Sequence, residues 1–155
     1  MPESRGFTLI ELLVVMVLVG LLAGMLGLSV SHSPARQARE EAALLMQQLQ
    51  NLREQAVLEG CEYGVRIEVD GYRMMRFEAP AWRVHGTARR LPAGLSMRLE
   101  LDGQTLSLGT QLDRPQLLLL SSDETSAFAV HFESVEQRWL SVFGDGLGEP
   151  ILHEP

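Results

Sequence analysis

The residue types that most often carry out chemistry are scattered through this sequence of 155 residues. Its histidines show no paired spacing such as His-x-x-x-His, so each is interpreted as an ordinary surface or loop residue and not as a metal ligand (His32, His85, His131 and His153). The single cysteine, Cys61, excludes an intramolecular disulfide and a multi-cysteine metal site, and it is interpreted as a small buried hydrophobic residue. Every basic residue is Arg, which excludes lysine-based covalent catalysis.

Two polar segments could in principle hold a ligand. Residues 121–125 (SSDET) are typical of a loop between strands, and no nucleophile-elbow pattern is present. Residues 144–148 (GDGLG) are rich in glycine, but no helix follows them, so a turn is favoured over a phosphate-binding loop. Calcium at Asp123 or Asp145 stays open as an alternative, but it is disfavoured because six or more oxygen ligands would have to converge. We therefore predict no catalytic residue, no metal ligand and no cofactor, and the chain is not expected to be an enzyme.

Glu11 is the one charged residue between Phe7 and Val30. As a helix, this apolar segment would be about 36 Å long, which exceeds a hydrocarbon core of about 30 Å. An ionised carboxylate costs about 2.5–3.5 kcal/mol at the centre of a membrane helix and less near an end. Glu11 either lies near the interface, where the helix dipole tolerates it, or has a cationic partner.

An ordinary secretory signal is the first alternative for this segment, with Ser29-Val30-Ser31 as its cleavage site. The apolar run is too long for such a signal and contains a carboxylate near its start. Arg5 is the only cation before the segment and favours a cytoplasmic amino terminus.

Residues 5–11 (RGFTLIE), followed by the apolar run, closely resemble the class III signal shared by type IV pilins and type II secretion pseudopilins. The resemblance implies a leader peptide at residues 1–6 and a retained membrane or filament-core helix at residues 7–30. It also implies that a prepilin peptidase cuts between Gly6 and Phe7 and methylates the new Phe7 amine. The chain would then be a single-pass protein of the bacterial inner membrane, with its head in the periplasm.

The residue chemistry agrees with this processing. Gly6 has no side chain, so an extended backbone can enter a protease cleft closely. Cleavage creates a cationic amine at Phe7, about one helical turn from Glu11. The Glu11 carboxylate could pair with its own amine or with that of a neighbouring subunit, and the second pairing would favour one axial register during assembly. The sequence leaves both pairings open.

Residues 31–155 have the pattern of a globular head. Apolar residues recur at steps of three and four from Ala38 to Ala56, which predicts an amphipathic helix over residues 35–59 that ends at Gly60. Seven strands are then predicted, with hairpin turns at Asp70-Gly71 and Asp102-Gly103 (strands at residues 63–69, 72–77, 95–101, 104–108, 117–120, 128–132 and 139–143). The expected fold is α+β: one long amino-terminal helix, with a membrane half and an amphipathic half, packed on an antiparallel sheet as in pilins.

The charge balance disfavours nucleic acid as a partner. The chain has 13 basic and 20 acidic residues, a net charge of −7, whereas phosphate binding needs clustered cations. Only Arg83, Arg89 and Arg90 form a small basic loop, within residues 79–94, where no element is predicted. Trp82 in this segment is expected to close the core.

The head further resembles the minor pseudopilin H family of type II secretion. The matching patterns are spread over most of the chain and are individually degenerate (residues 49–60, 63–66, 71–74, 91–95 and 145–148). This resemblance implies a structural subunit near the tip of a periplasmic pseudopilus that drives protein export. The implied partners are the prepilin peptidase, other minor and major pseudopilins, the inner-membrane assembly platform and, before assembly, membrane lipid. The alternative is a minor pilin of a type IV pilus, serving assembly, adhesion or DNA uptake.

Overall fold

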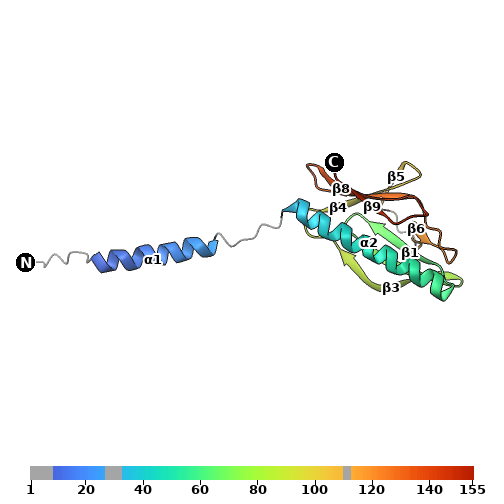
Figure 1. The fold of residues 1–155 in the computed structure, drawn as a ribbon, viewed down its shortest axis with the longest axis horizontal. Helices are drawn as coiled ribbons and strands as arrows, with labels where there is room; N and C mark the ends of the chain where they lie inside the picture. Colours follow the sequence, from blue (N-terminus) through green and yellow to red (C-terminus); the bar gives the residue numbers. More distant parts are fainter. Residues whose placement is uncertain (1–8, 27–32, 110–112) are drawn as a thin grey trace, which may run out of the picture. The chain divides into compact units, whose positions relative to one another are not determined.

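The computed structural model describes residues 9–26, 33–109 and 113–155, and the chain divides into two compact units, Met1–His32 and Ser33–Pro155. The first unit contains the helix α1 (Leu9–Leu26; Figure 1). Within the described residues, no helix has the length and apolar character that a membrane span requires. The segment predicted to be a membrane helix, residues 7–30, extends past both ends of α1 into residues outside the described ranges.

The second unit begins with α2 (Pro34–Glu59), which confirms the predicted amphipathic helix to within one residue. The Ser33 hydroxyl accepts a hydrogen bond from the backbone N–H of Arg36 at 3.2 Å, and Pro34 occupies the first turn, where its missing N–H costs nothing. Gly60 ends the helix in the left-handed conformation, with φ of 60°. Local capping residues therefore set both ends of α2.

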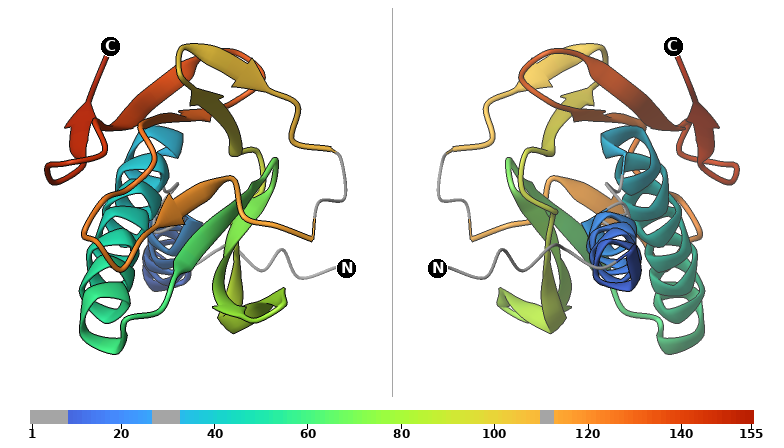
Figure 2. Two further views of the ribbon diagram at one scale, coloured as in Figure 1. Left: turned by 90° about the vertical axis from the view of Figure 1, so that its right-hand side faces the viewer. Right: turned by 90° about the vertical axis from the view of Figure 1, so that its left-hand side faces the viewer.

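The strands of the second unit form two antiparallel sheets. The first sheet has the order β3-β2-β1-β6 (β1 Tyr63–Glu68, β2 Gly71–Glu78, β3 Ala81–Arg90 and β6 Leu117–Leu119). The second has the order β5-β4-β7-β8-β9 (β4 Ser96–Leu101, β5 Gln104–Leu106, β7 Phe128–Glu133, β8 Arg138–Gly144 and β9 Ile151–His153). Helix α2 lies along one side of both sheets (Figure 2). This arrangement confirms the predicted α+β class, with two sheets where one was expected.

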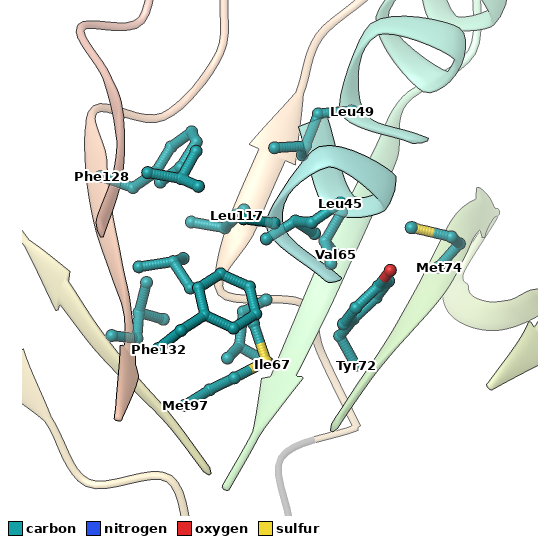
Figure 3. Packing of buried hydrophobic residues seen from close by; sticks show 14 of the residues in the cluster. Leu45, Leu49, Val65, Ile67, Tyr72, Met74, Met97, Leu117, Phe128 and Phe132 are labelled. Atoms are coloured by element: carbon teal, nitrogen blue, oxygen red, sulfur yellow. The ribbon is translucent and has the colours of Figure 1, made fainter. Parts of the chain in front are cut away.

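One hydrophobic core joins α2 to both sheets. Leu45 of α2, Ile67 of β1 and Phe132 of β7 are at most 1% exposed, and they meet in the interior with side chains from β2, β4 and β6 (Figure 3). The strand partners alternate as predicted, so that one residue in two points inward. Both sheets therefore pack against α2 through a single shared core.

Two strands were not predicted from the sequence, β3 and β9. Nearly all of β3 is exposed, and every residue of β9 is exposed, so neither has the apolar alternation that identifies a strand. Backbone pairing with β2 and β8 forms them instead. The residues interpreted as a basic loop thus belong mainly to an edge strand.

Two expectations about apolar residues were wrong. Trp82 does not close the core: it lies half-buried on β3, with its ring 5.3 Å from the ring of Phe77. The run at residues 117–120, expected to be buried on both faces, is buried on one, because Leu118 is 36% exposed. In both cases a position near a sheet edge leaves one side of the residue uncovered.

Candidate functional site

Glu11 lies in the first turn of α1 and is the one charged residue of that helix. The described side chains around it are apolar and exposed, from 50% at Val14 to 84% at Leu9. A helix that is apolar on all sides needs lipid or other helices around it. Gly6 and Phe7, the predicted cleavage and methylation residues, lie outside the described residues.

The head carries a groove of about 640 Å³ beside the carboxyl-terminal half of α2. Its apolar lining comes from α2, β6 and the start of β7 (Leu49, Val57, Leu58, Leu117, Leu118, Leu119 and Phe128). Its rim is polar and includes Arg53, Asp123 and Glu149. Sequence reasoning missed this groove. The signal was Val57 and Leu58, which extend the apolar surface of α2 beyond the stripe that faces the core.

Arg53 holds three segments together at the rim of the groove. From α2, its Nε donates to Asp123 Oδ1 at 2.6 Å, in the loop between β6 and β7. Its other nitrogens donate to the backbone carbonyls of Leu147 and Gly148, at 2.7 and 3.0 Å, in the turn between β8 and β9. The hydrogen bonds from Arg53 hold the pKa of Asp123 below its usual value. This one guanidinium therefore positions both loops beside the groove.

The two aspartates considered for calcium are used for structure. Asp123 binds Arg53, whereas Asp145 Oδ1 accepts backbone N–H bonds from Leu147 and Gly148 at 3.0 and 2.8 Å, which lowers the pKa of Asp145. Across residues 9–26, 33–109 and 113–155, no group of three or more acidic, histidine or cysteine side chains could hold a metal ion. The turn predicted at residues 144–148 does connect β8 to β9.

His131 was interpreted as a surface or loop residue, and this was wrong. It lies on β7, 2% exposed, on the sheet face opposite the core residues Val130 and Phe132. Its Nδ1 is 2.7 Å from Ser141 Oγ, and its Nε2 is 3.2 Å from Glu100 Oε1. Burial lowers the pKa of His131, which favours the neutral ring. Alternation along β7 predicts the outward face correctly, but neighbouring strands cover the ring there.

Ser141, His131 and Glu100 form a serine–histidine–carboxylate series, the side-chain types of a hydrolase. Ser141 is 3% exposed, however, so a substrate could not reach its hydroxyl. Around the series, Glu133 accepts from Arg98 and from Arg138, which builds a structural ion-pair network across β4, β7 and β8. The arrangement links three strands of the second sheet.

The sequence is similar to those of known proteins. Residues 1–27 match the Prokaryotic N-terminal methylation motif. Type II secretion system protein H of Pseudomonas aeruginosa is 40% identical over 97% of this chain and 96% of that protein. Type II secretion system protein H of Vibrio cholerae is 30% identical over 84% of this chain and 82% of that protein. Both alignments thus extend far beyond the amino-terminal motif and include the head.

Solved structures are similar as well. A crystal structure of the minor pseudopilin EpsH from the type II secretion system of Vibrio cholerae matches with a TM-score of 0.70 and 26% identity, covering 79% of this chain and 99% of that one. The solution structure of Escherichia coli GspH, 18% identical, matches in fold with a TM-score of 0.60, covering 81% of this chain and 94% of that one. With 40% identity along nearly its whole length to one relative and the fold of another, the chain belongs to the type II secretion system protein H family of minor pseudopilins.

Proposed function

We propose that this minor pseudopilin is a structural subunit near the tip of a periplasmic pseudopilus, assembled with other minor and major pseudopilins to drive protein export. The proposal rests on the family, whose named relatives are secretion proteins, and favours secretion over the alternative of a type IV pilus. A structural role also suits the described head, since its serine–histidine–carboxylate series is buried.

The amino-terminal segment supplies the anchor in this proposal. The prepilin peptidase cuts between Gly6 and Phe7 and methylates Phe7, and residues 7–30 then hold the chain in the inner membrane with the head in the periplasm. The match of residues 1–27 to a methylation motif supports the processing step. The assembly platform of the inner membrane then receives the processed subunit from the lipid.

Glu11 is the residue proposed to set the register of the helices during assembly. Its carboxylate lies in the first turn of α1 among exposed apolar side chains. Hydrophobic contact alone draws such helices together without setting their depth, because one apolar turn packs much like the next. An ion pair between Glu11 and the Phe7 amine of a neighbouring subunit favours a single axial register. Pairing with its own amine satisfies the charge and sets no register.

Substitution of Glu11 tests this role. Glu11→Gln removes the charge at similar size, and Glu11→Leu also removes the polarity, which makes membrane insertion easier. We expect both variants to be inserted and processed normally, yet to be recovered poorly with sibling pseudopilins after detergent extraction and to reduce secretion. Glu11→Asp keeps the charge and is the matched control. Assembly and secretion by Glu11→Leu at the level of the unchanged chain would rule out inter-subunit pairing.

A further inference from the structure

Strand β3 is the end strand of the first sheet, and its outer edge has no neighbour in the described parts of the chain (Figure 2). It runs for 10 residues, and it pairs regularly with β2 from Ala81 to His85 before a register shift interrupts the ladder. The backbone groups along its outer edge are therefore available to an added strand.

The hairpin of β2 and β3 has a charge opposite to that of the rest of the chain. Residues 71–90 contain five arginines and one acidic residue, Glu78, whereas the whole chain has 13 basic and 20 acidic residues. Three of these arginines are neutralised by ion pairs with acidic residues outside the hairpin (Arg73 with Glu68, Arg76 with Glu59 and Arg89 with Glu41).

The other two, Arg83 and Arg90, lie on β3 itself and are exposed, and they have no acidic partner among the described residues. Cations on an edge strand disfavour pairing with a second copy of the same edge, because like charges would be brought together. The same cations favour a strand that carries carboxylates. The exposed edge of β3 thus favours a negatively charged strand over a positively charged one.

Contacts on both sides hold β3 in place. The Arg89 guanidinium donates to both carboxylate oxygens of Glu41, a residue of α2 that is 4% exposed. The ring of His85 packs edge-on against that of Tyr63 at 5.3 Å, and Trp82 packs on Phe77. An edge that is already ordered loses little conformational entropy when a partner binds.

We propose that the outer edge of β3 accepts an acidic, extended segment of a partner protein as an added strand of the first sheet. Backbone hydrogen bonds along residues 81–85 supply the binding, and Arg83 selects for carboxylates on the face that it shares with Arg76. Arg90 lies beyond the register shift, on the opposite face of the sheet, and adds positive charge to the same edge. The surface belongs to the head and is separate from Glu11, so it extends the proposed function and can fail independently of it.

The test uses the full chain in detergent micelles with three synthetic eight-residue peptides. The first alternates Glu and Val, the second alternates Lys and Val, and the third has the acidic sequence with every peptide nitrogen methylated. We expect the acidic peptide to bind, measured by fluorescence anisotropy, and to slow hydrogen exchange of the β3 amides. The methylated peptide keeps the charge but cannot donate backbone hydrogen bonds, so its affinity should fall at least tenfold.

Charge reversal makes the test specific. In the double variant Arg83→Glu/Arg90→Glu, preference should switch from the acidic to the lysine peptide. The double variant Arg36→Glu/Arg114→Glu makes the same change in net charge at exposed arginines elsewhere and should keep the original preference. The measured quantity is the ratio of the affinities of the acidic and lysine peptides for the same variant. Differences in absolute affinity between variants therefore do not affect the result.

Four results would overturn the proposal. Equal binding of the methylated peptide would mean charge attraction without strand pairing. An unchanged preference in Arg83→Glu/Arg90→Glu, or no binding of the acidic peptide, would place any docking elsewhere. Sedimentation that shows dimers broken by the same double variant would make a second copy the occupant.

Discussion

The two units of this chain place their apolar residues in opposite ways. In α1 the described side chains are apolar and at least half exposed, from Leu9 to Leu21 with Glu11 and Gly20 as exceptions. In the head, Tyr63 and Phe132 are fully enclosed by α2 and two sheets. The first unit therefore depends on lipid or neighbouring helices for its environment, whereas the second makes its own. The difference predicts that each unit can be damaged without the other.

The largest expected effect is on processing. We expect Gly6→Val to block cleavage almost completely, because a branched side chain cannot enter the peptidase cleft, so that full-length precursor accumulates in the membrane. Mass spectrometry of the membrane-extracted chain measures this, and the unchanged chain should begin with methylated Phe7. The stability of the head should not change.

Gly20→Val is the matched control for this substitution. A Cβ atom at Gly20 meets no atom within 4 Å, and the residue lies in α1 away from the cleavage site, so processing should be normal. A mature chain that begins at Ser31 or His32 would instead establish an ordinary secretory signal.

The next effect concerns the core of the head. Leu49→Asp places a carboxylate at a position that is 4% exposed, and we expect a loss of several kcal/mol in the free energy of unfolding. Thermal unfolding of a head fragment that begins at Ser33 measures this loss. Processing of the full chain should continue, because the cleavage site is in the other unit.

Leu58→Asp makes the same chemical change nine residues later on α2, where the side chain is 84% exposed. We expect the melting temperature of this control to stay within a few degrees of the unchanged head. Similar melting temperatures for the two variants would show that the apolar stripe of α2 does not carry the core.

A smaller, pH-dependent effect is expected at His131. Burial lowers the pKa of this ring below its unfolded value of 6.5, against the opposing influence of Glu100. The unfolded chain therefore binds more protons as the pH falls through 6.5, so the head should lose stability there. The lowered pKa values of Glu133, Asp123 and Asp145 act at lower pH, since their ordinary values are 4.5 or less.

Urea unfolding of the head at a series of pH values measures this dependence. His131→Gln removes the titrating ring and should flatten the curve around pH 6.5, with a smaller change than Leu49→Asp at neutral pH. An equally steep curve in His131→Gln would assign the pH dependence to other groups.

Features that depend on neighbours along the chain could be predicted from the order of residues. Ser33, Pro34 and Gly60 cap α2 through their own backbone and side-chain preferences, and the period of its apolar residues identifies the buried face. The predicted Asp102-Gly103 turn between β4 and β5 is equally local, and both of its residues adopt a positive φ. The turn predicted at Asp70-Gly71 lies one residue earlier, at Val69-Asp70, because Gly71 already pairs with Glu68. The motif around Gly6, Phe7 and Glu11 can be identified from the sequence alone, because it is a contiguous run of residue types. Its roles remain predictions that require the processed chain.

Tertiary structure alone decided which residues meet across the head. Strand β3 forms because β2 offers it a backbone partner, and this pairing leaves no mark on its own side-chain pattern. His131 faces outward along β7 yet is buried by groups from β4 and β8, and Arg53 reaches two loops that lie 70 and 94 residues further along the chain. Periodicity predicts which side of an element a residue occupies. What covers that side depends on contacts between distant segments, which the order of residues does not specify.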